Sequence, residues 1–407
     1  MSTKTGIVFP YFWYLDERNK EVTVIRVYCL DQNNKVICLM INDFTPYIYL
    51  ELPKKTNGGS DITWDERKAQ KLSDKIVTRC GSHRPIKTSF LRKKKLYYCQ
   101  RFASNLQKET MFPFLLLAFS STEDRKRFVW KVSGKSFDVM GMGKITVKAH
   151  EQDANPILQL ACHRKIPMAG WIKFRGKQVR QGDRITLCDE YVVRWKNLTF
   201  EGGDTVPSPL ILSMDIEVYS CNPNRMPQAS IPSDKVFQIS CVLKRNGGTK
   251  ETKFLLTLGT PTPRLVGKDV TILNFNTEAD LLCGYAEFLQ KYQPNIVTGY
   301  NILGFDIPYM IERAKHNMVI DVFRRLGFPK YLPAEERQIK WSSSAYKVQR
   351  FEFLDAEGIL HVDLLPLIKR DYKFSNYKLK TVSEFFVGQT KVHFRPTSRK
   401  SNLYCKL

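Results

Sequence analysis

The chain has 407 residues, more than one ordinary hydrophobic core accommodates, so two domains are expected. No run of eighteen apolar residues occurs and the first residues lack the basic and apolar segments of a signal peptide, so we expect an intracellular protein with no membrane contact. The formal net charge of +24 favours a polyanion as partner, because a cation set against a phosphate releases a counterion. A generally lysine-rich composition explains the charge equally well.

Residues 1–205 are expected to form a β-rich domain with few long helices. Short β-branched and aromatic runs, separated by polar turns, occur at Glu21–Leu30, Lys35–Met40 and Tyr47–Leu52. The basic cluster Arg92–Lys95 comes shortly before Tyr97 and Tyr98, and such a mixture of cations and rings suits a single nucleic acid strand. An edge strand whose cations face solvent is the alternative interpretation of this cluster.

A segment rich in Gly, Pro and Ser, Glu201–Pro209 (EGGDTVPSP), separates this region from the rest of the chain. We place a domain boundary inside it, so that residues 206–407 form the second domain. Strands alternate there with helices, and the predicted elements are strands at Ile211–Val218, Phe237–Leu243 and Asn295–Val297 and helices at Thr277–Tyr292 and Ile307–His316. This alternation is typical of a sheet covered by helices.

Two carboxylates interrupt the first apolar strand of the second domain. Asp215 and Glu217 are two residues apart, so they share one face of the strand. We expect both to be buried, where their mutual repulsion and lost hydration favour a cation between them. Hard oxygen ligands suit magnesium or manganese. An acid pair on a solvent-facing edge strand is the alternative.

A third acid follows a predicted strand that ends at Gly299. Asp306 comes directly before a predicted helix with Pro308 in its first turn, and ligands of open α/β sheets bind beside such strand ends. Tyr300, Asn301 and Phe305 supply an amide and aromatic faces suited to a nucleotide. The alternative role for Asp306 is simple capping of the helix.

The order of these motifs, D-I-E and then Y-N-x-x-x-F-D about ninety residues later, resembles the Exo I and Exo II motifs of family B DNA polymerases, in the DEDD exonuclease superfamily. Further blocks are similar to DNA polymerase delta and to polymerases of large eukaryotic DNA viruses: residues 44–49, 358–365, 375–382 and 385–388. The resemblance implies a β-rich N-terminal domain (1–205) and a ribonuclease H-like exonuclease domain (206–407), whose mixed central sheet is flanked by helices.

The resemblance also implies two-metal hydrolysis that removes mismatched nucleotides from a 3′ end of DNA. Asp215, Glu217 and Asp306 are then the catalytic acids and the ligands of two Mg²⁺ or Mn²⁺ ions. The implied partner is DNA, both its single-stranded 3′ primer end and its template, and the predicted DNA contacts are Tyr300, Asn301, Phe305 and Tyr377.

One part of the family pattern is not found. The Exo III motif, Y-x-x-x-D, is absent after Gly388, and no S-L-Y-P-S or Y-G-D-T-D motif of a palm domain occurs. We therefore interpret the chain as ending before Exo III and the palm, and we expect feeble exonuclease activity or none from this chain alone. Polymerisation would require a palm domain, for example on a second polypeptide.

These observations lead to three functional hypotheses, of which the first is favoured. The chain is the N-terminal and exonuclease part of a replicative polymerase, acting in a host nucleus or at a cytoplasmic site of viral replication. Alternatively, it is a standalone 3′-5′ exonuclease, or a catalytically inactive module that binds DNA.

Overall fold

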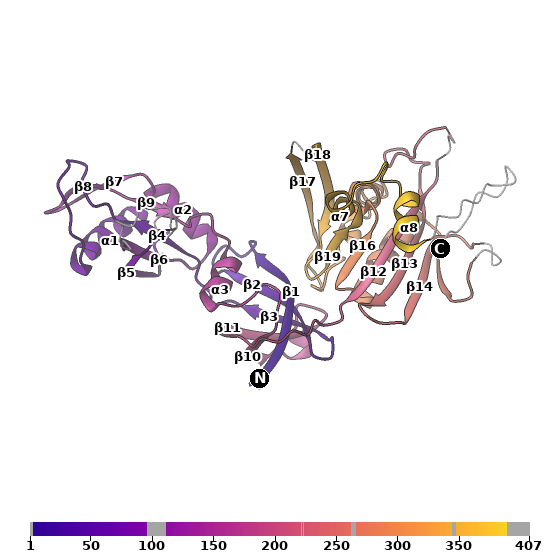
Figure 1. Ribbon diagram of the computed structural model, residues 1–407, viewed down its shortest axis with the longest axis horizontal. Helices are drawn as coiled ribbons and strands as arrows, with labels where there is room; N and C mark the ends of the chain where they lie inside the picture. The colour runs from indigo at the N-terminus through magenta and orange to yellow at the C-terminus, as the bar shows by residue number, and fades with distance from the viewer. Residues whose placement is uncertain are drawn as a thin grey trace. The chain divides into compact units, whose positions relative to one another are not determined.

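The computed structural model describes residues 3–95, 111–220, 222, 224–261, 266–343 and 347–388. The fold divides into two compact units (Figure 1), and unit 1 consists of Met1–Asp31, Ile37–Val179 and Glu190–Asp204. Unit 2 consists of Gln32–Val36, Arg180–Asp189 and Thr205–Leu407. Two short segments of the first half of the chain therefore pack with unit 2. The domain boundary at 205/206 stays a prediction.

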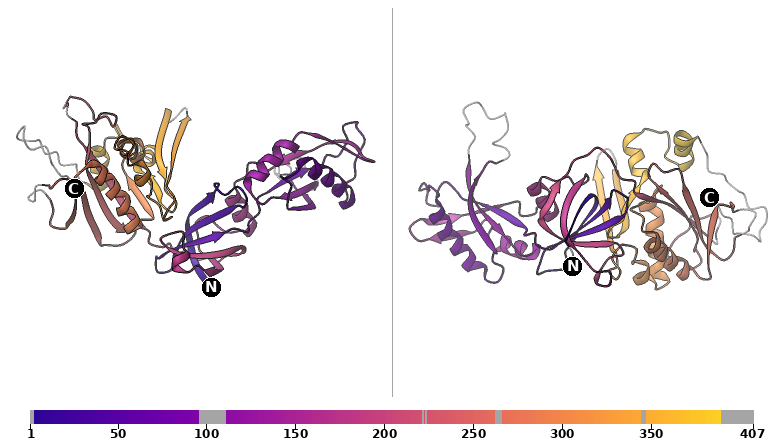
Figure 2. Two further views of the ribbon diagram at one scale, coloured as in Figure 1. Left: turned by 180° about the vertical axis from the view of Figure 1, so that it is seen from behind. Right: turned by 90° about the horizontal axis from the view of Figure 1, so that it is seen from below.

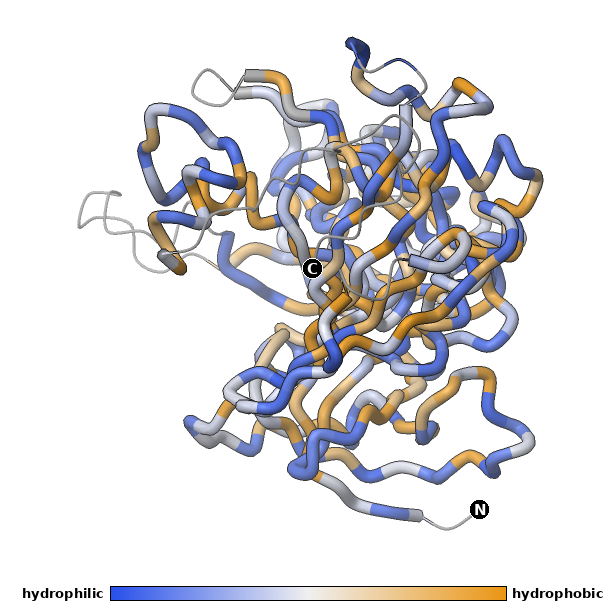
Figure 3. Tube along the Cα trace, turned by 90° about the vertical axis from the view of Figure 1, so that its right-hand side faces the viewer, coloured by the Kyte–Doolittle hydropathy of each residue, from blue (hydrophilic) through white to orange (hydrophobic). Residues whose placement is uncertain are grey.

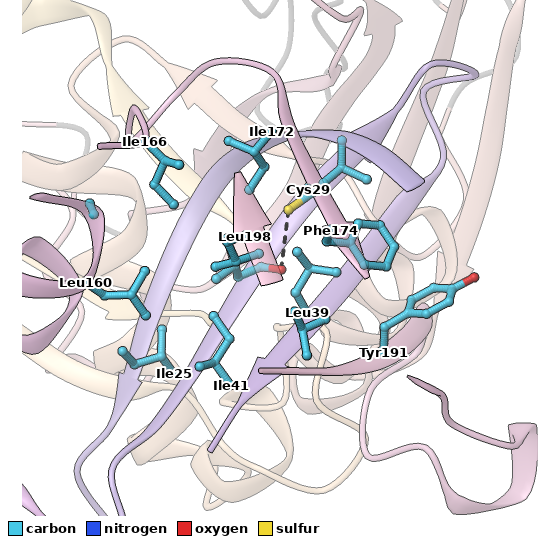
Figure 4. Close-up of a cluster of buried hydrophobic side chains, with 14 of the residues drawn as sticks. Ile25, Cys29, Leu39, Ile41, Leu160, Ile166, Ile172, Phe174, Tyr191 and Leu198 are labelled. Carbon is cyan, nitrogen blue, oxygen red and sulfur yellow. Dashed lines mark hydrogen bonds between the residues drawn. The ribbon is translucent and has the colours of Figure 1, made fainter. Parts of the chain in front are cut away.

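A closed five-stranded barrel forms one part of unit 1. Its strands, in the order in which they pair, are β1 (Thr3–Asp16), β10 (Ile172–Gln178), β11 (Asp189–Phe200), β3 (Val36–Ile41) and β2 (Val24–Asp31). Alternate side chains of these strands fill the interior together with one face of α3 (Pro156–Arg164), as Figure 4 shows for Leu39, Ile172, Phe174 and Leu160. The runs of β-branched and aromatic residues thus form strands because each has an inward face.

A four-stranded antiparallel sheet forms the other part of unit 1. Its order is β5 (Lys87–Lys93), β6 (Phe112–Ala118), β4 (Tyr47–Glu51) and β9 (Lys148–His150). The core beside it also takes side chains from α1 (Glu66–Cys80), α2 (Thr122–Val132) and the hairpin of β7 (Ser136–Val139) and β8 (Gly143–Thr146). Arg92 and Lys93 lie on edge strand β5, as the edge-strand interpretation of the basic cluster expects, whereas Tyr97 and Tyr98 lie outside the described residues.

Unit 2 is built on a six-stranded mixed sheet. Its order is β15 (Val270–Phe275), β14 (Glu251–Leu258), β13 (Val236–Arg245), β12 (Leu210–Val218), β16 (Ile296–Gly299) and β19 (Leu360–Asp363). Central strand β12 is antiparallel to β13 and parallel to β16, and β16 is parallel to β19. The predicted fold class, a β-rich first region and a mixed sheet flanked by helices, is confirmed.

Helices and one hairpin complete unit 2. They are α4 (Glu278–Tyr292), α5 (Ile307–His316), α6 (Ile320–Phe323), α7 (Leu364–Asp371), α8 (Leu379–Val387) and the pair β17 (Glu335–Ser343) and β18 (Lys347–Asp355). Figure 2 shows the helices in orange and yellow tones beside the sheet. Hydrophobic and polar residues alternate over short stretches of the backbone (Figure 3). None of the helices in the described ranges has the length and apolarity needed to span a bilayer.

Helix α4 shows why this layer forms where the sequence predicts it. The Thr277 side chain caps the helix by accepting from the backbone N–H of Asp280, and the buried face includes Leu281, Tyr285 and Leu289. The Tyr285 hydroxyl lies 3.1 Å from the sulfur of Met214 on β12. Helix α4 therefore covers one face of the central strand, and the opposite face carries the acids.

Candidate active site

The two acids of β12 lie on the strand face that is not packed against α4. Met214 and Ile216 are buried, whereas Asp215 between them is exposed and Glu217 is partly exposed. The expectation that both carboxylates are buried is therefore wrong for Asp215. The alternation of the strand puts Asp215 and Glu217 on one face, as predicted, but the helices of the unit cover the other face.

Asp306 is the buried acid of the site, with 3% of its surface exposed. It occupies the position before α5, yet its side chain forms no capping bond to that helix. Instead its Oδ1 accepts the backbone N–H of Ile216 on β12 at 3.1 Å. Simple helix capping is thus the wrong interpretation of Asp306, because its carboxyl joins the turn before α5 to the central strand.

Electrostatics couple Asp306 to the acid on β12. Burial, followed by the nearby Asp215 carboxylate, raises the pKa of Asp306 to about 7, although the N–H of Ile216 opposes the shift. Asp363 adds a smaller raising effect. An ionised Asp306 consequently needs a positive charge nearby. A strongly perturbed carboxyl beside a second acid is a feature that functional sites share with buried structural pairs.

The carboxylate oxygens of the three predicted acids are the kind of ligand that a hard divalent cation prefers. Asp215 and Asp306 are brought together, and Glu217 follows on the same strand face; their carboxylate oxygens are ligands that magnesium and manganese accept. Across the residues that the structure describes, no three His, Cys, Asp or Glu side chains are grouped closely enough to hold a metal ion. Two of the three predicted acids are therefore adjacent, and a complete three-ligand set is not assembled.

The segment between β16 and α5 is held tightly. A Cβ on Gly299 would lie 2.6 Å from the carbonyl oxygen of Met214, so only glycine lets the two strands approach this closely. Asn301 has a left-handed backbone, with φ of 66°, and the π-helical turn Ile302–Asp306 then leads into α5. This conformation places Asp306 beside β12, next to Ile216.

Asp363 fixes this segment, and sequence analysis did not assign it a role. It is the last residue of β19 and is 6% exposed. Its carboxylate accepts the backbone N–H groups of Asn301 at 2.8 Å, Leu303 at 3.0 Å and Leu365 at 2.9 Å. Two features of the sequence could have indicated its role: Asp363 directly precedes a helix, and it lies in the block 358–365 that resembles the family. The contacts with the segment before Asp306 depend on β19 lying beside β16.

We predict that Asp363→Ala lowers the free energy of unfolding of unit 2 by about 2 kcal/mol, because buried backbone donors lose a charged acceptor. Hydrogen exchange of residues 299–306 should accelerate in the same variant. Urea unfolding combined with peptide-resolved exchange measures both effects. Asp371→Ala is the matched control, since this exposed acid of α7 pairs with its neighbour Arg370. Equal exchange in both variants would contradict the role given to Asp363.

The predicted nucleic acid contacts lie close to this segment. The Tyr300 hydroxyl donates to the carbonyl oxygen of Tyr377 at 2.6 Å, and burial, followed by Asp363 and Tyr377, raises the pKa of Tyr300. Phe305 is half-buried and its ring centre lies 5.5 Å from that of Tyr309. Tyr300 and Tyr377 are thus brought together, and Asn301 and Phe305 belong to the adjoining turn.

A hollow of about 430 Å³ adjoins the same turn. Leu303, Gly304 and Pro308 line one side of it, and residues of the β17–β18 hairpin, among them Lys340 and Arg350, line the other. Glu352 of the hairpin also lines the hollow, so the hairpin adds two cations and one acid beside the turn.

Comparisons with known proteins agree with this architecture. Residues 147–382 match the model of the DNA polymerase family B exonuclease domain. The chain is 38% identical to a DNA polymerase of Invertebrate iridescent virus 3 over 96% of its length, and 27% identical to a DNA polymerase delta catalytic subunit of Oryza sativa over 90%. The structure of a family B DNA polymerase from the archaeon Pyrobaculum calidifontis covers 94% of the chain with a TM-score of 0.60 at 17% identity, a similarity of fold.

The fold is thus that of the exonuclease portion of a polymerase, a mixed sheet flanked by helices behind a β-rich region. The chain belongs to the family B DNA polymerases. It covers 35% of the iridescent virus protein, 33% of the rice protein and 40% of the archaeal chain, so it spans about a third of the length of the curated relatives that it matches.

Proposed function

We propose that this chain supplies the N-terminal domain (1–205) and the 3′-5′ exonuclease domain (206–407) of a replicative DNA polymerase, and that its site removes nucleotides from a DNA 3′ end. The observation that carries the proposal is the coupling of buried Asp306 to Asp215 across adjacent elements of a family B exonuclease fold. Two adjacent carboxylates repel each other, so stability alone does not account for their proximity.

In this proposal Asp215, Glu217 and Asp306 hold two magnesium or manganese ions. Such ions stabilise the attacking and the leaving oxygen of a phosphodiester during in-line displacement. The bond from the N–H of Ile216 fixes one carboxyl oxygen of Asp306 beside β12. Gly299 and Asp363 position the turn that carries Asp306.

The DNA strand is proposed to end beside the turn before α5. Tyr300, Asn301, Phe305 and Tyr377 are the candidates for contact with the terminal nucleotides, through rings and an amide. The cations Lys340 and Arg350 of the adjoining hollow are suited to phosphates.

The test uses a primer with a mismatched, labelled 3′ end and the purified chain in the presence of Mg²⁺ or Mn²⁺. We expect removal of the terminal nucleotide, measured with the chain alone and with a polypeptide that carries a palm domain, to fall at least ~100-fold in the double variant Asp215→Ala/Glu217→Ala in whichever reaction shows cleavage, since metal-ligand and electrostatic effects of this size are usual in active sites. Asp321→Ala, an exposed acid on α6 of the same unit, is the control. Cleavage that survives the double variant would contradict the assignment.

The other outcomes separate the alternatives. Binding of the primer without cleavage, also in the presence of a polypeptide that carries a palm domain, would favour a non-catalytic DNA-binding module. Cleavage that depends on such a polypeptide would favour a polymerase assembled from two chains. We propose that the protein works where the DNA is replicated, in a host nucleus or at a cytoplasmic viral site.

A further inference from the structure

The face of the sheet that carries the acids continues beyond β12 with two buried polar side chains. Glu217 of β12 pairs with Gln238 of β13, and Gln238 pairs with Thr257 of β14. Residues that lie directly opposite each other in an antiparallel sheet project to the same side. Glu217, Gln238 and Thr257 therefore form a polar row across three strands, on the face opposite to α4.

The two inner members of this row are withdrawn from solvent. Gln238 and Thr257 are both 0% exposed, whereas Glu217 is partly exposed. Moving an amide or a hydroxyl group out of water costs free energy unless the group forms hydrogen bonds. The Oγ1 of Thr257 is buried and, within the described ranges, meets no hydrogen-bond partner. The hydroxyl group of Thr257 therefore does not stabilise the sheet, and valine would suit this strand position as well.

Gln238 differs from Thr257 because it lies opposite a carboxylate. The Cβ atoms of directly opposite residues are about 4.5–5.5 Å apart, and the amide of a glutamine extends beyond its Cβ, so the amide of Gln238 can reach the carboxylate of Glu217. An amide offers two N–H donors and carries no charge. It can therefore hold a carboxylate in place and still leave the negative charge of that carboxylate to a cation.

A β-bulge adjoins this pair. The pairing of β12 with β13 is regular from Leu210 to Glu217, but Val218 pairs with Val236, so that Phe237 is the extra residue of β13. Bulges are common next to active sites, where they change the direction of neighbouring side chains. The irregularity distinguishes the glutamate and its partner from the regular pairs before them.

We propose that Gln238 is a positioning residue for Glu217, whose carboxylate it holds toward the cation by donating from its side-chain amide. Asp306 has a corresponding contact, since the N–H of Ile216 fixes one of its carboxyl oxygens. Groups that hydrogen-bond a metal-ligating carboxylate orient it, and their loss lowers the affinity for the metal. The inference rests on the proposed function, because it takes Glu217 as a ligand of the cation. Since Gln238 is fully buried, it acts only through Glu217.

The test measures the affinity of the full chain for Mn²⁺ alone, without DNA, from the electron paramagnetic resonance signal of the free ion. Gln238→Met replaces the amide by an unbranched apolar group of the same length, and we expect the dissociation constant for Mn²⁺ to rise about 10-fold. Thr257→Val is the matched control, because it removes a buried polar group from the same row and leaves the pair with Glu217 intact. Its affinity for Mn²⁺ should equal that of the wild type.

A second substitution keeps the test decisive if Gln238→Met does not fold. Gln238→Asn retains a buried amide but withdraws it from Glu217 by one methylene group, so it should weaken Mn²⁺ binding in the same way. Urea unfolding in a chelator identifies which variants retain the fold. Wild-type affinity in the folded variants of Gln238, or an equal loss of affinity in Thr257→Val, would overturn the proposal.

A double-mutant cycle separates positioning from a general effect on the fold. If Gln238 acts through Glu217, adding Gln238→Met to Glu217→Ala should leave the dissociation constant for Mn²⁺ unchanged. A further loss of about 10-fold in the double variant would mean that Gln238 acts independently of Glu217, and the proposal would be wrong.

The variant Asp215→Ala/Glu217→Ala distinguishes the failure of this inference from the failure of the proposed function. If the wild type binds no Mn²⁺, or if this variant binds it equally well, the acids do not hold the cation and both proposals are wrong. If this variant loses binding while Gln238→Met keeps the wild-type affinity, only the role given to Gln238 is wrong.

Discussion

Replacing Arg313 by alanine should lower the free energy of unfolding of unit 2 by about 3–5 kcal/mol, because it leaves a buried carboxylate without its cationic partner. Arg313 and Glu278 are 1% and 2% exposed in their side chains and form an ion pair at 2.5 Å between α5 and α4. Glu278 also accepts the backbone N–H of Val236 at 2.8 Å. Arg313 donates to backbone carbonyl oxygens of residues 229, 231 and 232, between β12 and β13. One arginine therefore joins two helices and a loop.

Lys315→Ala provides the matched comparison on the same helix. Lys315 pairs with Glu336 at 2.9 Å, but its side chain is 39% exposed, so its removal should cost less than ~1 kcal/mol. Hydrogen exchange of peptides from α4 and α5 at increasing urea concentration reports unit 2 separately from unit 1. If both variants lose the same free energy of unfolding, the buried ion pair of Arg313 contributes no more than an exposed one, and the prediction is wrong. Because α5 begins directly after Asp306, we also expect Arg313→Ala to impair the candidate active site.

The elements of unit 2 were largely predictable because each carries a local signal. Helix α5 spans Ile307–His316 as predicted, with Pro308 in its first turn, and the apolar run predicted as Ile211–Val218 forms β12. Helix α1 was not predicted, because its sequence is polar except for one narrow face of residues such as Leu72 and Ile76, and the Asp65 cap is a single residue.

The site was predictable only in part. The strand period put Asp215 and Glu217 on one face, but which face the helices cover is decided by packing between distant segments. The role of Asp363 depends on backbone N–H groups about sixty residues earlier, so no local pattern encodes it. Likewise, residues 32–36 and 180–189 pack with unit 2 through contacts that composition does not reveal.

Replacing Asp306 by asparagine should stabilise the metal-free protein at pH 8 by on the order of 3 kcal/mol. Asparagine keeps an oxygen for the N–H of Ile216 but cannot ionise. The pKa of Asp306 is raised to about 7, above its value of about 3.9 in the unfolded chain, so the folded state retains a proton that the unfolded state has lost. The stability of the wild-type protein therefore declines as the pH rises from about 4 through 7, and the variant should lack this part of the decline.

Urea unfolding in a chelator at pH 5 and pH 8 measures the difference in free energy of unfolding between the wild-type protein and Asp306→Asn. Asp269→Asn is the control, because Lys253 holds the pKa of this exposed carboxyl below its usual range and its removal should cause only a small loss of stability. Parallel pH dependence of the wild type and Asp306→Asn would show that Asp306 ionises freely in the fold. Added Mg²⁺ should restore stability at pH 8 to the wild-type protein more than to the variant, because a cation favours the ionised carboxyl that asparagine lacks. A site that lowers stability unless a cation is bound is the expected property of acids retained for catalysis.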